Sequence, residues 1–265
     1  NKSVIKVDTE LFQSNTDTSV VIAWDFNPYL VNAVGYYKFN ETSGTTFVDS
    51  LGLNSGIYNG SPTLAQAGLI GTSVNFGNTG SDQYAVLSDS NDFKFTTGSN
   101  DIPFSISLWI NPNGTSFDII NKYNETGDNR EWELYVQSGV LYFKMYDNGL
   151  TSNQLVSISS GAIVSSGSGW NHITVTYDGT GVNDSLKVYY NNVAVLNTGD
   201  ASWQIGNYTN LKQTTQDVWI GNELGDVSAY NFEMDEMVIW KNRVLTTIEI
   251  DYLYNSGSGR NLPIV

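Results

Sequence analysis

The sequence predicts an all-β protein that folds as a two-sheet antiparallel jelly-roll sandwich with one short C-terminal helix. Three observations support this fold class. Apolar and polar residues alternate with the period of a β-strand in many segments, turns rich in Asp, Asn and Gly recur about every dozen residues, and one segment alone has helical spacing. The 265 residues are 40% hydrophobic and 13% aromatic, which is enough apolar material for one large core.

The strand pattern is clearest in segments 104–110 and 173–177. Each places apolar side chains on one face and Ser, Thr or Trp on the other. Two hairpins are expected as well. Segments 131–136 and 140–146 flank a turn at Ser138-Gly139, and segments 187–190 and 193–196 flank a turn at Asn191-Asn192.

The helical segment is 245–254. Leu245, Ile248 and Tyr252 recur at helical spacing, and either Thr246 or Thr247 can cap the N-terminus. A Gly at position 257 follows the expected end of the helix. We therefore expect one short helix after the last strand.

The N-terminal extension, residues 1–33, has the pattern of two strands at 3–7 and 19–26 with a turn between them. The second strand is apolar on both faces, so it needs a partner sheet. It either completes its own sandwich, the favoured interpretation, or adds to a neighbouring subunit and makes a homo-oligomer.

Composition excludes several classes of function. The net charge of −15 argues against nucleic acid and against an anionic membrane surface. No apolar run approaches the roughly 18 residues that membrane insertion requires. The chain has no Cys, which excludes thiolate metal sites and cysteine nucleophiles. The single histidine, His172, lies in a strand pattern without a nucleophile elbow, and we expect it to be structural.

Four phrases in a fixed order carry a family resemblance: YKFNETSGTTFVDS at 37–50, SISLWINP at 105–112, WNHITVTYDG at 170–179 and MDEMVIWKNRVL at 234–245. Together they resemble the laminin-G-like branch of the concanavalin A-like lectin/glucanase domains. The resemblance covers about residues 34–256 and implies a laminin-G-like jelly-roll domain over residues 34–265. It does not identify a ligand, because the fold hosts many functions.

The resemblance also implies one Ca²⁺ ion near the loop after the first strand. Its ligands would be Asp49, Asn54 and Asp235 together with nearby backbone carbonyls. These oxygen donors on irregular backbone are of the kind that Ca²⁺ prefers. The alternative is that Asp49 only caps a turn through neighbouring backbone N–H groups.

An enzymatic function needs paired acids, since related glucanases carry Glu-x-Asp-x-Glu on one strand. Here Glu233 and Asp235 share a face, Glu236 is expected on the opposite face, and position 237 is Met. A second pair, Glu131 and Glu133, has no third acid. We therefore expect no glycanase activity and assign no catalytic residue.

Carbohydrate binding needs aromatic rings on loops. Tyr58, Tyr123, Trp203, Tyr208 and Tyr230 lie among Asn, Gly and Ser and could stack on a sugar. The same residue types are common in protein interfaces and at the bases of loops.

These features predict a non-catalytic adhesion or carbohydrate-recognition module, stabilised by Ca²⁺. Its partner would be a glycan or a surface protein. The alternative is a structural subunit of a filament, fibre or capsid that assembles through residues 1–33. Either protein would be extracellular or surface-associated, whether secreted, on a cell or on a virion.

Overall fold

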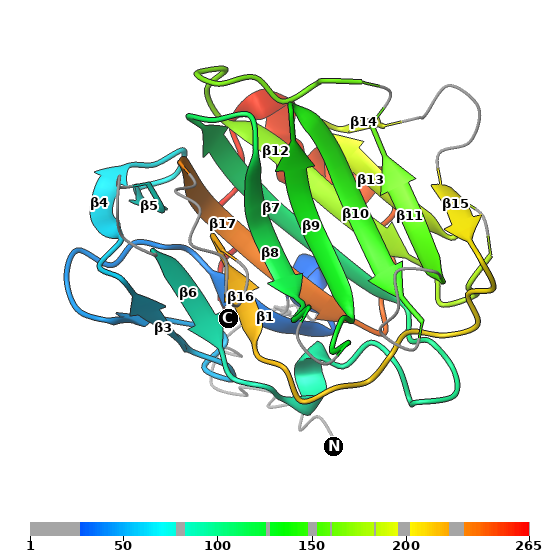
Figure 1. Ribbon diagram of the computed structural model, residues 1–265. Coiled ribbons are helices and arrows are strands. Elements are labelled where there is room, and N and C mark those ends of the chain that lie inside the picture. The colour runs from blue at the N-terminus through cyan, green and yellow to red at the C-terminus, as the bar shows by residue number, and fades with distance from the viewer. Residues whose placement is uncertain are drawn as a thin grey trace, which may run out of the picture.

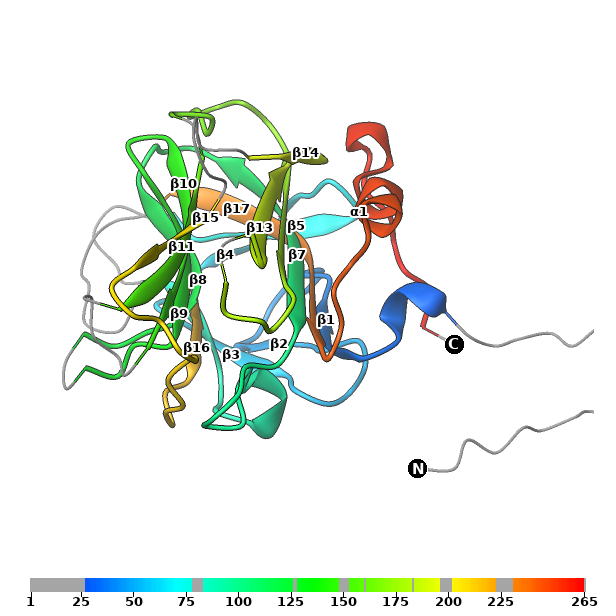
Figure 2. The ribbon, with the colours of Figure 1, turned by 90° about the vertical axis from the view of Figure 1, so that its right-hand side faces the viewer.

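The computed structural model describes residues 27–77, 83–125, 128–147, 153–159, 161–182, 184–195, 202–222 and 231–264, without the side chains of 202–204. Within them two antiparallel sheets pack face to face, as the sequence predicts (Figures 1 and 2). The two expected strands of the N-terminal extension lie outside the described residues.

The eight-stranded sheet has the order β14-β13-β12-β7-β17-β5-β4, and β1 also pairs with β17. Its strands are β1 (Ala33–Tyr37), β4 (Thr63–Ala67), β5 (Thr72–Asn75), β7 (Phe104–Pro112), β12 (Asn171–Tyr177), β13 (Leu186–Tyr190), β14 (Val193–Ala194) and β17 (Phe232–Lys241).

The nine-stranded sheet has the order β15-β11-β10-β9-β8-β16-β6-β3-β2. Its strands are β2 (Thr46–Phe47), β3 (Gly56–Asn59), β6 (Tyr84–Leu87), β8 (Phe117–Lys122), β9 (Trp132–Gln137), β10 (Val140–Tyr146), β11 (Gln154–Ile158), β15 (Ser202–Ile205) and β16 (Val218–Ile220).

Both expected hairpins are present, and their turns have the backbone geometry that tight hairpins require. Ser138 and Gly139 link β9 to β10, and Asn191 and Asn192 link β13 to β14. All four residues have positive φ, which suits a two-residue turn of the primed type.

The main core lies between the sheets and is rich in aromatic side chains. Alternation places every second residue of β7 in it, as expected, and the intervening residues on the outer face. That outer face is covered by a second cluster, which joins Trp240 and Tyr36 to Ile250 and Leu253 of the helix. Figure 2 shows the helix lying outside the eight-stranded sheet.

Helix α1 (Thr247–Tyr254) confirms the expected helix, and Thr246 caps it in a capping box with Glu249. The expected apolar face is wrong in one respect: Ile248 is 79% exposed, whereas Ile250 is buried. The helix is short, so contact with the sheet decides which side faces inward. Short 3₁₀ helices occur at η1 (Pro28–Leu30), η2 (Asn91–Phe93) and η3 (Asn255–Gly257).

The described end of the N-terminal extension packs on its own domain. The Trp240 indole donates to the Tyr29 carbonyl at 2.8 Å, and the Tyr29 ring stacks on Tyr252 at 3.7 Å. Asn27 donates to the carbonyl of Pro263, so both ends of the described chain meet beside the helix.

Two glycines offer a test of how tightly the sandwich edge is packed. A Cβ on Gly56 would lie 2.1 Å from the Phe47 ring and 2.6 Å from the Val86 carbonyl, whereas one on Gly114 would meet nothing closer than 3.7 Å. Gly56→Ala should therefore lower the free energy of unfolding in urea by about 1–3 kcal/mol. Gly114→Ala is the matched control and should leave it nearly unchanged. Equal effects would contradict this packing.

Candidate functional site

Asp49 lies in the loop after β1, where a calcium ligand is expected, but its carboxylate is already occupied. Oδ1 accepts from the backbone N–H groups of Tyr36 and Leu51, and Oδ2 accepts from those of Leu53 and Asn54, all at 2.8–3.0 Å. Four N–H dipoles aimed at one carboxylate satisfy it as a turn cap and present positive partial charge where a cation would sit.

The other expected ligands do not join Asp49 in a cage. The Asn54 amide nitrogen donates to the Val34 carbonyl and to Asp92, and Asp235 accepts from the backbone N–H of Ile70. Within the described ranges, no three His, Cys, Asp or Glu side chains gather as a metal site. The three residues therefore do not fit Ca²⁺ in this arrangement, and calcium binding stays a prediction.

Asp235 and Glu236 form a buried acidic pair at a β-bulge in β17. Contrary to expectation, Glu236 lies on the same side of the sheet as Asp235, because the bulge adds a residue and Glu236 takes a φ of 46°. The Tyr36 hydroxyl donates to Glu236. One oxygen of each acid, Oδ1 of Asp235 and Oε1 of Glu236, is buried without a hydrogen-bond partner.

Burial raises the pKa of both acids. The pKa of Asp235 rises from 3.8 to about 7, and the pKa of Glu236 rises from 4.5 to about 8, with the Asp235 charge adding to the second shift. Both carboxyls therefore hold their protons to higher pH in the folded protein than in the unfolded chain.

His172 is structural, as expected. Its Nε2 lies 2.7 Å from the Ser107 hydroxyl, its ring packs on Trp109 at 4.8 Å, and it is buried. Burial lowers the pKa of His172 to about 3, so the ring stays neutral. Its Nδ1 has no hydrogen-bond partner, and no carboxylate completes a triad around it among the described residues.

The predicted sugar-stacking residues are scattered. Tyr208 is 4% exposed, belongs to the main core and donates to the half-buried Asp101, so its ring has no free face. Tyr123 is half-buried, with the Arg130 guanidinium 5.5 Å from its ring centroid. Trp203 lies in β15 opposite Val156, but its side chain, like all of Tyr230, lies outside the described residues.

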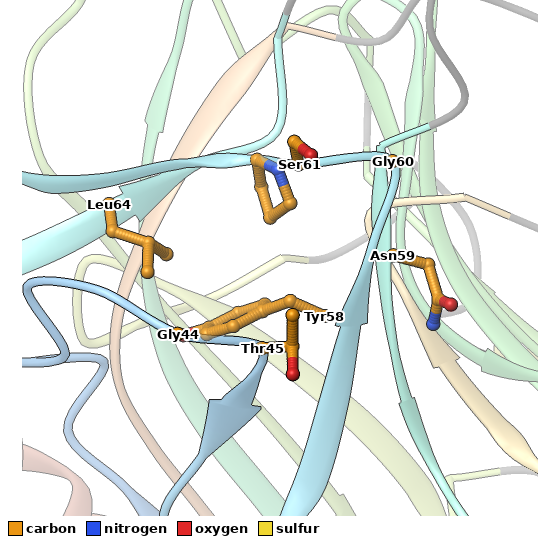
Figure 3. A pocket seen from close by; sticks show the side chains of 8 residues that line it. Gly44, Thr45, Tyr58, Asn59, Gly60, Ser61 and Leu64 are labelled. Carbon is orange, nitrogen blue, oxygen red and sulfur yellow. The ribbon is translucent and has the colours of Figure 1, made fainter.

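Tyr58 lines a pocket of about 310 Å³ at the edge of the sandwich, although its ring is only 4% exposed. Its hydroxyl donates to Glu41 at 3.1 Å. Figure 3 shows its ring and Leu64 bordering one space, with Asn59 at the side. The remaining lining residues are Gly44, Thr45, Gly60, Ser61 and Pro62, and none of the eight is charged.

A set of half-exposed side chains that the sequence analysis missed lies on the outer face of the nine-stranded sheet. We call it the aromatic face: Tyr84, Tyr135, Tyr142, Lys144 and Trp219. Figure 1 looks onto this face, with α1 on the far side of the molecule. Each of these residues alternates with core residues on its strand. Aromatic residues at the alternate, outward positions of a strand are therefore the sequence signal that could have predicted this face.

Ring contacts hold the aromatic face in a fixed geometry. Tyr135 and Tyr142 are cross-strand partners whose rings stack at 4.8 Å, and Tyr84 stacks on Trp219 at 4.5 Å. The Lys144 ammonium lies 4.8 Å from the Tyr135 centroid and 3.4 Å from Glu133.

The aromatic face adjoins the pocket. Asn59 of the pocket is the cross-strand partner of Tyr84 in β6, and the exposed Ile57 pairs with Val86, which in turn pairs with Trp219.

The hydrogen bonds of Asp49 predict a structural phenotype. Asp49→Ala should lower the free energy of unfolding by about 1–3 kcal/mol, because four backbone donors lose their acceptor. The loss should be the same in excess Ca²⁺ and in chelator, measured by urea unfolding. A wild-type stabilisation by Ca²⁺ that disappears in the variant would instead make Asp49 a ligand.

The raised carboxyl pKa values predict how stability depends on pH. The folded state binds more protons than the unfolded state between about pH 4 and pH 8, so the pair's contribution is greatest below pH 4 and is lost as the pH rises to 8. Urea unfolding at pH 5 and pH 8 should show this fall, and the double variant Asp235→Asn, Glu236→Gln should show less of it. An identical pH profile in both proteins would refute the assignment.

Comparisons with known proteins support the fold. Residues 78–251 match a family model described as the concanavalin A-like lectin/glucanases superfamily. No curated protein sequence matches the chain. The binding domain of Paraclostridial Mosquitocidal Protein 1 superposes with a TM-score of 0.65 at 19% identity, covering 86% of this chain and 53% of that one.

Two further structures come from botulinum neurotoxins. One, the binding domain of type DC, is in complex with rat synaptotagmin II, with a TM-score of 0.62 and 18% identity over 85% of this chain and 52% of that chain. The other is a structure of type C, the neurotoxin whose cell entry is described as dependent on interaction with two ganglioside molecules. It has a TM-score of 0.61 and 18% identity over 85% of this chain and 51% of that chain. This chain spans about half the length of these structures. By its family match, the chain belongs to the concanavalin A-like lectin/glucanases superfamily.

Proposed function

We propose that this domain is a non-catalytic glycan-binding module of a secreted or surface-exposed protein, and that the aromatic face is its binding surface. The observation that carries the proposal is the half-exposed tyrosine and tryptophan side chains on a sheet face that α1 and the described termini leave uncovered. Aromatic rings offer apolar faces to the C–H groups of sugars, and the half-exposed Lys144 offers a polar partner beside them.

The arrangement of the acidic side chains supports a non-catalytic role. Glu233 accepts hydrogen bonds from Asn75 and Asn111, and Asp235 and Glu236 are buried on the opposite side of the sandwich from the aromatic face. Hydrolysis of a glycosidic bond needs two carboxyl groups facing the substrate.

The structural neighbours support recognition of a surface partner. One is a binding domain in complex with a protein, rat synaptotagmin II, and another is linked to gangliosides, which carry glycans. A glycan is the partner that the aromatic face favours, because its rings alternate with hydrogen-bonding groups across several strands.

Substitutions on the aromatic face test the proposal. After a glycan array identifies a ligand, Trp219→Ala and Tyr135→Ala should each weaken its Kd about ten-fold in calorimetry, as loss of one stacked ring predicts. Tyr189→Ala removes a half-buried tyrosine beside the helix and is the matched control. Unchanged affinity in the first two variants, or an array without any bound glycan, would reject the proposal.

A further inference from the structure

One cluster of charged side chains is unrelated to the aromatic face. Lys122, the last residue of β8, is fully buried, and its ammonium lies 2.7 Å from Glu131 and 3.0 Å from Asp89. Glu131 is also fully buried, whereas the Asp89 side chain is 18% exposed. A second ammonium, that of Lys94, lies 3.2 Å from the other oxygen of Asp89.

Such a cluster is costly for a protein interior. Removing a lysine and a carboxylate from water is seldom repaid in full by their mutual attraction, so apolar residues would serve stability as well. Strand pairing places Lys122 opposite Trp132, a residue of the main core. Neither stability nor exposure to solvent explains these charges, so the cluster is expected to have another role.

Lys122 lies between the two acids, in contact with both. Asp89 Oδ1 lies 3.0 Å from the ammonium nitrogen and is buried without a hydrogen-bond partner. Glu131, in contrast, is hydrogen-bonded to the ammonium and is fixed by the backbone N–H and hydroxyl of Thr214 at 2.7 and 2.6 Å.

From this arrangement we propose that Lys122 and Asp89 become joined by an intramolecular isopeptide bond, with Glu131 carrying the protons. The link would tie the end of β8 to the segment after β6. It does not depend on the proposed glycan-binding function.

The reaction balances without any added reagent. Glu131 carries one proton from the Lys122 ammonium to the Asp89 carboxylate, and the resulting neutral amine attacks the carboxyl carbon of the neutral acid. Glu131 then takes a second proton from the attacking nitrogen and passes it to the departing hydroxyl oxygen, which leaves as water. The N–C bond forms, one C–O bond breaks, and the ammonium and carboxylate become an amide and one water molecule.

The surroundings favour each step. Burial raises the pKa of Glu131, against the opposing effect of Lys122, which suits a group that must accept and release a proton. The Lys94 ammonium lies at the oxygen of Asp89 on which negative charge develops during attack. Holding amine and carboxyl in contact replaces a bimolecular encounter, and the dry site favours the uncharged amide.

Intact-mass spectrometry of the denatured, purified chain tests the proposal directly. The expected mass is one water below that of the sequence. After trypsin, residues 39–94 and 95–130 should be recovered as one branched peptide, because the amide at Lys122 blocks cleavage there. Localisation by fragmentation excludes loss of water at any other residue.

Three variants define the roles. Lys122→Met and Glu131→Gln keep the side-chain size and should both give the full sequence mass, whereas Lys144→Met, at the half-exposed lysine that pairs with Glu133, should keep the loss of water. If the wild-type chain has the full mass and trypsin releases residues 95–122, the cluster is only an ion pair and the proposal is wrong. This result requires no variant to fold.

Discussion

The structure depends on strand β17, because one of its edges pairs with two different strands in succession. Along its whole length β17 pairs with β7, while its other edge pairs with β5 at its start and with β1 at its end. The bulge at Asp235 and Glu236 makes this change of partner possible, because the extra residue with positive φ shifts the register between the two halves. The consequence is a pair of buried carboxyls with raised pKa values at the centre of the sheet.

The same pairing divides the molecule into a covered face and an open one. Because β1 joins β17, the residues before β1 and after β17 meet on the outer face of the eight-stranded sheet, where Trp240 packs under α1. No helix of the described residues covers the outer face of the nine-stranded sheet, where Tyr84, Tyr135, Tyr142 and Trp219 are half-exposed. The proposed function follows from this asymmetry.

Much of the fold could be predicted from local sequence, since alternation, turn residues and the Thr246 cap act within a few positions. The candidate site could not be predicted in this way, because the direction and burial of its side chains depend on long-range contacts. Tyr208 is surrounded by polar residues in sequence yet points into the core, whereas Trp219 sits in a strand yet faces outward. Asp49 matched a ligand position, but four backbone donors decide its role. The bulge at Glu236 has no local signature and reversed the expected direction of its side chain.

Two substitutions at Glu236 test most directly whether the bulge governs the sheet. Both Glu236→Gly and Glu236→Val remove the buried carboxyl, but only glycine accepts positive φ without strain. At pH 8 the buried Glu236 carboxyl of the wild type no longer stabilises the folded state by holding its proton. Urea unfolding at this pH should therefore show Glu236→Gly to be at least as stable as the wild type. Glu236→Val should be less stable than Glu236→Gly by about 1–3 kcal/mol. Equal stability of the two variants would contradict the account.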